Sequence, residues 1–385
     1  MPTDPSRTYF NPAPPLTVPA APDPALLAFH RKLPGYAVTP LVRAPHLATA
    51  LGVRGAWVKD EADRLGLPAY KILGAAWATY RELETLCGPF RPWETLEELA
   101  AQLRPRLPLT LVTATDGNHG RAVARMARWL GLGAHILVPQ DMVRARTGAI
   151  AAEGARVEVV PGTYDEAVAA AARLADRRHL VISDTAWDGY TRVPAWVVEG
   201  YGTIFQEIDG QLAEFGARQP DVVAAQMGVG SLAMAVVRHY RAPGRSSRVV
   251  GVEPARADCV LRSLEAGQLT GAPGPHPSIM AGLNCGHASP LAWPFLRGGL
   301  SASVAIADIW AEAAMRLLAR DGVVSGESGA AGAAGLLALL AGDGGARARA
   351  ALGITPDSTV LVLSTEGDTD PAAYARIVGR GAADA

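Results

Sequence analysis

Lys71 stands in an apolar, alanine-rich run, LPAYKILGAAWA, which extends from Leu67 to Ala78. The chain has only three lysines, Lys32, Lys59 and Lys71, among 36 basic residues, so arginine supplies nearly every other positive charge. An apolar setting penalises the ammonium form of a lysine and makes the free amine available, which a Schiff-base lysine requires. The alternative is a lysine whose stem packs on the core while its head reaches water. Lys71 by itself does not decide between the two.

Four further segments with unusual residues follow strand-like runs or open helical ones. In parallel α/β sheets, ligands bind where strands end and helices begin, so these turns are candidates for a site. The segments are DGNHG at 116–120, MGVGSLA at 227–233, SGESGAAGAAG from Ser325, and TEGDTDP at 365–371. Asn118 and His119 of the first fit either a cleft position or a structural role in the turn.

The second segment has the composition of a phosphate-binding loop. Gly228, Gly230 and Ser231 lie between a buried strand and a helix, where backbone N–H groups can hold an anion. The same glycines, with Ala233 and with Glu253 at the end of the next strand, also fit a dinucleotide fingerprint. Near the carboxyl terminus, a hydroxyl pair follows a buried strand. An aldehyde cofactor with a phosphate tail accounts for the lysine, the glycine loop and the hydroxyls together.

The elements that must position these residues alternate between strands and helices. Strand patterns occur at 110–115, 134–139, 156–161, 180–185, 221–226, 248–254 and 358–364, and helical patterns at 121–130, 164–177, 196–215, 232–240 and 309–320. This alternation predicts an α/β protein with two open, mostly parallel twisted sheets flanked by helices. We expect a large cofactor-binding domain from 1–85 plus 206–385 and a smaller, mobile domain from 86–205, with an extended arm over the first 25 or so residues.

Composition narrows the classes of function. The 385 residues are 49% hydrophobic with a formal net charge of −1, which gives no footprint for nucleic acid or a membrane surface. The longest apolar run, at 330–342, is too short to span a bilayer. Three spaced cysteines, Cys87, Cys259 and Cys285, and eight histidines without ligand spacing predict neither a disulfide framework nor a metal site. We therefore expect a reduced, cytoplasmic protein with a small-molecule substrate.

Six ordered motifs, YKILGA, TATDGNHGRAVA, GVGSLA, SIMAGLNCG, SGESGA and STEGDTDP, resemble those of the pyridoxal-phosphate enzymes of the tryptophan-synthase-β type (fold type II). The resemblance covers nearly the whole chain. Related serine and threonine dehydratases usually have Ser or Ala where this chain has Asp116. The acidic form of this loop, together with STEGDTDP, resembles the diaminopropionate ammonia-lyase branch.

This resemblance implies a role for each matching residue. Lys71 would bind pyridoxal 5'-phosphate as a Schiff base and then remove the Cα proton of an L-substrate. Asp116 would be the base for a D-isomer, and Asp184 a second acidic group near the substrate, with Thr115 and Tyr70 beside it. The remaining cofactor contacts would be Gly228, Val229, Gly230 and Ser231 to the phosphate, Asn118 to the ring hydroxyl, and Ser364 or Thr365 to the ring nitrogen, with Ser364 favoured. The family also implies a homodimer.

The expected reaction is α,β-elimination of 2,3-diaminopropionate to pyruvate and ammonia. Around the lysine, however, the family usually has LNAFK and LGGSYA, whereas this chain has LPAYK and LGAAWA. These changes keep open a serine or threonine dehydratase, a β-replacement synthase, or a lyase for another β-substituted amino acid. An NAD-dependent dehydrogenase built on the Gly228 fingerprint leaves Lys71 and the Asp116 loop unexplained. A cofactor-binding sensor without turnover is the third class.

Overall fold

Two open sheets organise the chain in a computed structural model that describes residues 6–12, 16, 18, 24–115, 117–342 and 344–379. Each sheet belongs to a separate compact unit. The first unit is built from described residues within Met1–Ala21, Val38–Asp63 and Ile204–Ala385. The second is built from those within Pro22–Ala37 and Arg64–Thr203. The predicted α/β class with two mostly parallel sheets is confirmed.

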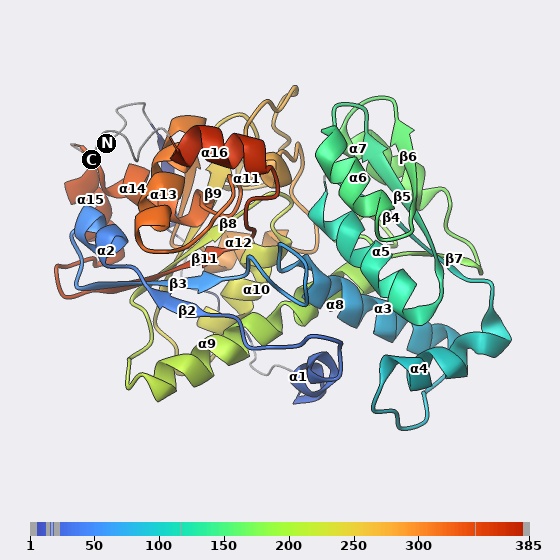
Figure 1. The fold of residues 1–385 in the computed structure, drawn as a ribbon. Helices are drawn as coiled ribbons and strands as arrows, with labels where there is room; N and C mark the ends of the chain where they lie inside the picture. Colours follow the sequence, from blue (N-terminus) through green and yellow to red (C-terminus); the bar gives the residue numbers. More distant parts are fainter. Residues whose placement is uncertain are drawn as a thin grey trace. The chain divides into compact units, whose positions relative to one another are not determined.

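The first unit contains a seven-stranded sheet (Figure 1). Its five central strands are parallel, and the two edge strands pair antiparallel to their neighbours. In spatial order the strands are β1 (Arg7–Phe10), β10 (Ala302–Ile306), β9 (Arg248–Pro254), β8 (Val222–Gln226), β11 (Thr359–Ser364), β3 (Gly55–Asp60) and β2 (Leu41–Arg43). The carboxyl ends of β8 and β11 are therefore neighbours, which places the predicted phosphate loop beside the predicted hydroxyl pair.

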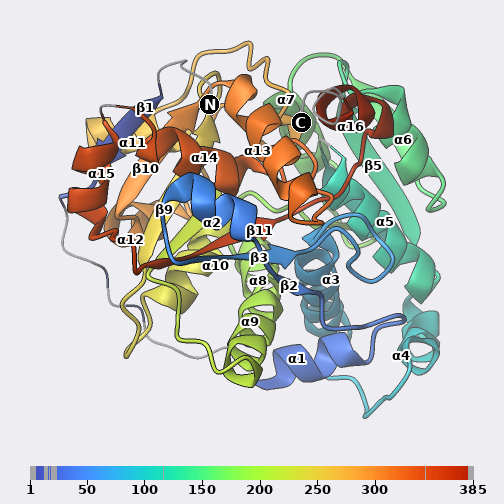
Figure 2. The same cartoon turned by 60° about the vertical axis from the view of Figure 1, so that its left-hand side comes forward.

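Helices cover both faces of this sheet, with α13 and α14 on one face and α10 on the other (Figure 1). Alternate residues of β8, such as Val222 and Ala224, join the core cluster under α13 and α14. Helix α2 packs beside these two helices (Figure 2). The helices of this unit are α2 (Pro45–Leu51), α9 (Gly202–Glu214), α10 (Ser231–Tyr240), α11 (Cys259–Ala266), α12 (Trp293–Gly299), α13 (Asp308–Arg320), α14 (Ala331–Leu340), α15 (Gly345–Leu352) and α16 (Pro371–Val378), with a 3-10 turn η2 (Ala281–Leu283).

The second unit contains a four-stranded, wholly parallel sheet (Figure 1). In spatial order its strands are β6 (Arg156–Val160), β5 (Gly133–Pro139), β4 (Thr110–Ala114) and β7 (His179–Val181). Its helices are α1 (Pro24–Arg31), α3 (Lys71–Cys87), α4 (Leu96–Leu103), α5 (Asn118–Leu130), α6 (Arg144–Ala151), α7 (Tyr164–Ala172) and α8 (Arg192–Gly200), with a 3-10 turn η1 (Arg104–Arg106). None of the helices in the described ranges of the chain is long and apolar enough to cross a membrane.

The division into units differs from the predicted domains in three segments. Residues 24–37 and 64–85 were expected in the large domain, yet they belong to the second unit, and residues 204 and 205, expected in the smaller domain, belong to the first. The physical reason is packing: α3 lies against α8 and α5, and α1 lies against α3. Lys71 therefore belongs to the same unit as α5 and the described residues of the loop before it. The predicted mobility of the smaller domain stays a prediction.

Each of the seven predicted strands overlaps an observed one, but four strands were missed. Two of these, β1 and β2, are short edge strands, and β1 lies in the segment predicted as an extended arm. The other two, β3 and β10, are central strands with weak sequence patterns. The helix expected at 196–215 is interrupted, because α8 ends at Gly200 and α9 begins at Gly202.

A close crossing between α3 and α8 fixes the helix that begins at Lys71. The two helices meet at glycines: a Cβ atom added to Gly200 would lie 2.6 Å from the Leu73 carbonyl oxygen and 2.7 Å from Gly74 Cα. An added Cβ at Gly74 would meet the Val197 carbonyl oxygen at 2.7 Å. Since these neighbours are backbone atoms, neither helix can yield without moving the other.

We expect Gly200→Ala to lower the free energy of unfolding by about 1–3 kcal/mol, because the methyl group overpacks this crossing. Gly148→Ala in α6 is the matched control, since a Cβ there has no atom within 4 Å. Urea unfolding followed by circular dichroism measures both variants. Equal stability of the two variants would contradict the role of the crossing.

Candidate active site

Lys71 and Asp184 form a largely buried ion pair in the second unit. Lys71 is the first residue of α3, and Asp184 lies in the loop that follows β7. The Lys71 Nζ donates to Asp184 Oδ2 at 2.6 Å, with the lysine side chain 18% exposed and the aspartate side chain 7% exposed. Tyr164, the first residue of α7, donates its hydroxyl to the other carboxylate oxygen at 3.3 Å. The lysine head is thus paired with a carboxylate, whereas the sequence predicted an apolar setting.

The environment of Asp184 keeps it ionised. Burial favours the neutral carboxyl, but the Lys71 charge and the hydrogen bonds from Lys71 and Tyr164 outweigh it and hold the pKa well below its usual value. Asp184 is therefore an anion at any pH at which the folded protein is expected to work. Such a group can bind a cation, but it cannot act as a proton donor.

The loop before α5 is organised by Thr115. Its Oγ1 accepts hydrogen bonds from the backbone N–H groups of Gly117 and Gly120, both at 2.9 Å. Asn118 is the first residue of α5 and is partly exposed, while Asp116 lies outside the described residues. Thr115 thus shapes the turn, and its predicted contact with the substrate stays a prediction.

His119 connects this loop to the strand end that precedes Asp184. Its Nε2 donates to the Ile182 carbonyl oxygen at 2.8 Å, and its Nδ1 has no hydrogen-bond partner among the described residues. Burial lowers the pKa of His119, so the ring is neutral. The sequence left a cleft position and a structural role open for this residue, and the hydrogen bond to Ile182 supports the structural one.

Tyr70, which precedes the lysine, is buried against Tyr201. The two ring centroids are 4.7 Å apart, and Lys71 Nζ lies 5.5 Å from the centre of the Tyr70 ring. The tyrosine that replaces the family's usual phenylalanine therefore remains next to the lysine head.

The other two lysines have structural partners. Lys59 is fully buried in β3, where its Nζ donates to Glu207 at 2.8 Å and to the Thr39 carbonyl oxygen at 2.7 Å. Lys32 donates to the Trp93 carbonyl oxygen at 2.6 Å. The contacts of Lys59 and Lys32 stabilise the fold, which leaves Lys71 as the candidate for imine chemistry.

In the first unit, the loop between β8 and α10 has little room for side chains at its two glycines. A Cβ atom at Gly228 would lie 3.0 Å from Cys285 Sγ, and one at Gly230 would lie 2.6 Å from a Leu296 methyl group. Gly230 also has a φ of +94°, which favours glycine. Val229 is anchored by its carbonyl oxygen, which accepts from the Ser289 N–H at 2.8 Å.

This loop leads directly into the first turn of α10, which begins at Ser231. The N–H groups of a first helical turn point outward along the axis and attract anions. The hydroxyls of Ser364 and Thr365 lie at the end of the neighbouring strand β11 and are both buried. A phosphate loop and a pair of hydroxyls at one sheet edge fit the phosphate and the ring nitrogen of pyridoxal phosphate.

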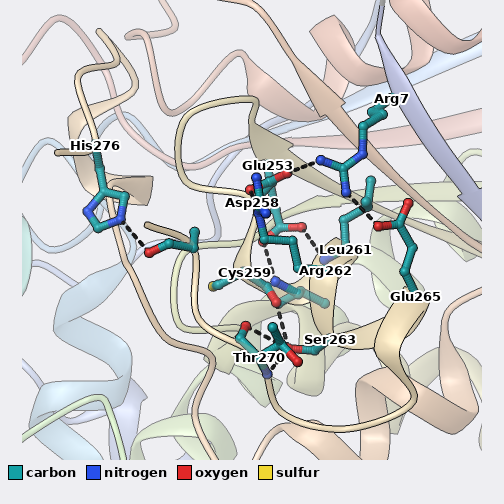
Figure 3. A network of polar contacts seen from close by, with 12 residues as sticks. Arg7, Glu253, Asp258, Cys259, Leu261, Arg262, Ser263, Glu265, Thr270 and His276 are labelled. Atoms are coloured by element: carbon teal, nitrogen blue, oxygen red, sulfur yellow. Dashed lines mark hydrogen bonds and ion pairs between the residues drawn. The ribbon is translucent and has the colours of Figure 1, made fainter. Parts of the chain in front are cut away.

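The dinucleotide alternative fails at Glu253. A ribose-binding acid needs free oxygens, but Glu253 is fully buried and accepts the backbone N–H groups of Val260 and Leu261, each at 2.8 Å (Figure 3). Asp258, which directly precedes α11, makes a second contact at this turn by accepting a hydrogen bond from Arg7 at 2.6 Å. The acid that completed the fingerprint therefore fixes the start of α11.

Sequence reasoning missed two site neighbours, Tyr164 and Gln226. Tyr164 was part of a predicted helix, and its contact with Asp184 depends on the turn before α7. Gln226 ends β8 and donates to the Thr365 hydroxyl at 2.8 Å. Its only signal was a polar residue in an otherwise apolar strand. No group of His, Cys, Asp or Glu side chains in the described ranges is arranged to hold a metal ion.

Comparison with known proteins decides the family. Residues 32–366 match the family described as "Pyridoxal-phosphate dependent enzyme". The chain belongs to this family of pyridoxal-phosphate dependent enzymes. Its cofactor is therefore pyridoxal 5'-phosphate, as the sequence predicted.

Individual members of the family are similar over almost the whole chain. The diaminopropionate ammonia-lyase of Escherichia coli K12 is 37% identical over 365 residues, which are 92% of this chain and 90% of that protein. A crystal structure of the E. coli enzyme in complex with D-serine has a TM-score of 0.86 at 34% identity, covering 98% of this chain and 97% of that one. A second E. coli structure, with an aminoacrylate-PLP azomethine reaction intermediate, has a TM-score of 0.84 at 32% identity and the same coverage. The predicted fold type II architecture is confirmed.

Glu253 makes the stability of the protein depend on pH. Burial raises the pKa of Glu253 to about 8, although the two N–H groups act in the opposite direction. An acid with a raised pKa keeps its proton in the folded state after the unfolded chain has lost it. The free energy of unfolding should therefore fall as pH rises through the window from about 4.5 to about 8, by at most about 1.4 kcal/mol per pH unit.

We expect Glu253→Gln to flatten this pH dependence, because the amide does not titrate. Urea unfolding at intervals between pH 5 and pH 8, compared with the wild-type protein, measures the slope. Glu214→Gln, at an exposed position in α9, is the control and should keep the wild-type slope. An unchanged slope in Glu253→Gln would show that the carboxyl is already ionised in the folded protein.

Proposed function

We propose that the chain catalyses the α,β-elimination of 2,3-diaminopropionate to pyruvate and ammonia. The observation that supports this most directly is the buried Asp184 carboxylate in contact with Lys71. A substrate with a second ammonium group at its β-carbon gains from a nearby buried anion, whereas a hydroxyl substrate gains less. The similarity to proteins named diaminopropionate ammonia-lyase supports the same substrate.

The residues that the resemblance assigns to the cofactor would hold it. Gly228, Val229, Gly230 and Ser231 would bind its phosphate, Asn118 its ring hydroxyl, and the Ser364–Thr365 pair its ring nitrogen. The cofactor would supply a sink for the electron pair left at the substrate Cα, once the substrate amine has replaced Lys71 on it. The chain's own contribution is then to orient the substrate and to move protons.

Lys71 and the acidic loop would carry out the proton transfers. The Nζ of Lys71 would remove the Cα proton of the L-isomer, and Asp116 that of the D-isomer. Asp184, held as an anion, would bind the β-ammonium and keep it protonated, which is the form in which an amine leaves. Tyr70 and Thr115 would lie beside the substrate. Each turnover consumes one water and yields one pyruvate and two ammonia.

Asp184→Asn should lower kcat/KM for 2,3-diaminopropionate by about 10- to 100-fold, because one charge-assisted contact to the ammonium is lost. Asp188→Asn, an exposed position in the same loop, is the matched control and should remain near the wild-type value. Pyruvate release measures turnover, with L-diaminopropionate and L-serine as parallel substrates.

The ratio between the two substrates separates recognition from a general effect on Lys71. If Asp184 recognises the β-ammonium, the loss for diaminopropionate exceeds the loss for any serine turnover. An equal loss for both would mean that Asp184 acts only through the lysine. Wild-type turnover of serine or threonine alone would overturn the proposed substrate.

A homodimer and a cytoplasmic location complete the proposal, both from the family resemblance and the composition. Sedimentation equilibrium of the holoenzyme tests the first, and a single species of twice the chain mass is the expected result. Fractionation of cells tests the second.

A further inference from the structure

Gln226 links the two strand ends that carry the cofactor residues of the first unit. It is the last residue of β8, and it is 3% exposed. Its Nε2 lies within hydrogen-bond distance of four oxygens: Thr365 Oγ1 at 2.8 Å and the carbonyl oxygens of Leu363 at 3.0 Å, Gly329 at 3.1 Å and Ser328 at 3.2 Å. β8 thus connects through one side chain to β11 and to the loop before α14.

The orientation of this amide is determined by its neighbours. Three of the four oxygens are carbonyls, which accept but cannot donate. An amide turned by half a circle would place its own oxygen against them. The Oε1 atom instead faces α14, where a Cβ on Gly332 would be 3.4 Å away, and it has no hydrogen-bond partner among the described residues. The Nε2 is therefore the atom that meets Thr365.

The donor role of Gln226 fixes the role of the Thr365 hydroxyl. Because the amide nitrogen gives a hydrogen to Thr365 Oγ1, that oxygen acts as the acceptor, and its own hydrogen is left to point elsewhere. The adjacent hydroxyl is different, since Ser364 Oγ donates its hydrogen to Ser325 Oγ at 2.8 Å. Of the two hydroxyls that end β11, Thr365 is the one whose hydrogen remains for a ligand.

We propose that Thr365, and not the initially favoured Ser364, donates to the ring nitrogen of the cofactor, and that Gln226 is the positioning residue that orients this hydroxyl. The inference deepens the cofactor part of the proposed function and does not depend on its substrate. The sheet register shows that the two strand ends are neighbours. β11 and β8 pair in register from Val360 opposite Val222 to Val362 opposite Ala224, so Gln226 and Ser364 are two residues beyond the last pair. The phosphate loop begins directly after Gln226.

A double-mutant cycle on the full-length protein tests the coupling. Gln226→Met, Thr365→Val and the double variant are titrated with pyridoxal phosphate, and the dissociation constant and the wavelength of the visible absorption band are recorded without any amino-acid substrate. Each single variant should weaken cofactor binding by about 2- to 10-fold, the effect of one hydrogen bond. The double variant should be no weaker than Thr365→Val, and both single variants should shift the band in the same direction.

Two results would contradict the inference. If the losses in Gln226→Met and Thr365→Val multiply in the double variant, Gln226 has a structural role that is independent of Thr365. If Ser364→Ala shifts the band more than Thr365→Val does, the ring nitrogen is bound by Ser364. Thr365→Ser, which keeps the hydroxyl, should retain the wild-type band.

The second comparison leaves Gln226 unchanged, so it still gives a result if Gln226→Met does not fold, and Gln226→Leu then replaces it in the cycle. Failure of the proposed lyase activity would be distinguishable from failure of this inference. It would appear as absent turnover in a wild-type protein whose cofactor binding still follows the cycle.

Discussion

The contact between Lys71 and Asp184 combines two requirements that oppose each other. An imine needs a primary amine, which arginine lacks, so a lysine must be placed in a largely buried position. A buried ammonium needs an anion nearby, and Asp184 supplies it at 2.6 Å. The pair in turn requires that α3 begin at the lysine and that the loop after β7 reach it. The glycine crossing of α3 and α8 and the hydrogen bond from His119 to Ile182 both serve this arrangement.

The first unit meets a different constraint, which is to bring several buried polar groups to one edge of a sheet. Glycines at 228 and 230 permit a loop too tight for side chains, and the helix that follows offers its first turn to a phosphate. The two buried hydroxyls at the end of β11 each have a partner from another segment, Gln226 for Thr365 and Ser325 for Ser364. Lys59 shows the same principle away from the site, because its buried charge is paired with Glu207.

Local patterns predicted much of this molecule. The alternation of strands and helices predicted both sheets, and the glycine and hydroxyl motifs identified the turns at which β8 and β11 end. The features that local patterns did not predict depend on contacts between residues far apart in the sequence. The burial of Lys59 depends on Glu207, 148 positions away, and the role of Gln226 on Thr365, 139 positions away. The assignment of α3 to the second unit follows from its packing against α8, which no local pattern encodes.

The most direct test of the account is to determine which lysine binds the cofactor. Borohydride reduction of the holoenzyme joins pyridoxal phosphate permanently to that side chain, and peptide mass spectrometry then locates it. With only three lysines in the chain, the result is unambiguous. The account predicts the modification on Lys71 alone. Modification of Lys59 or Lys32 would contradict it, since the chemistry would then lie away from Asp184.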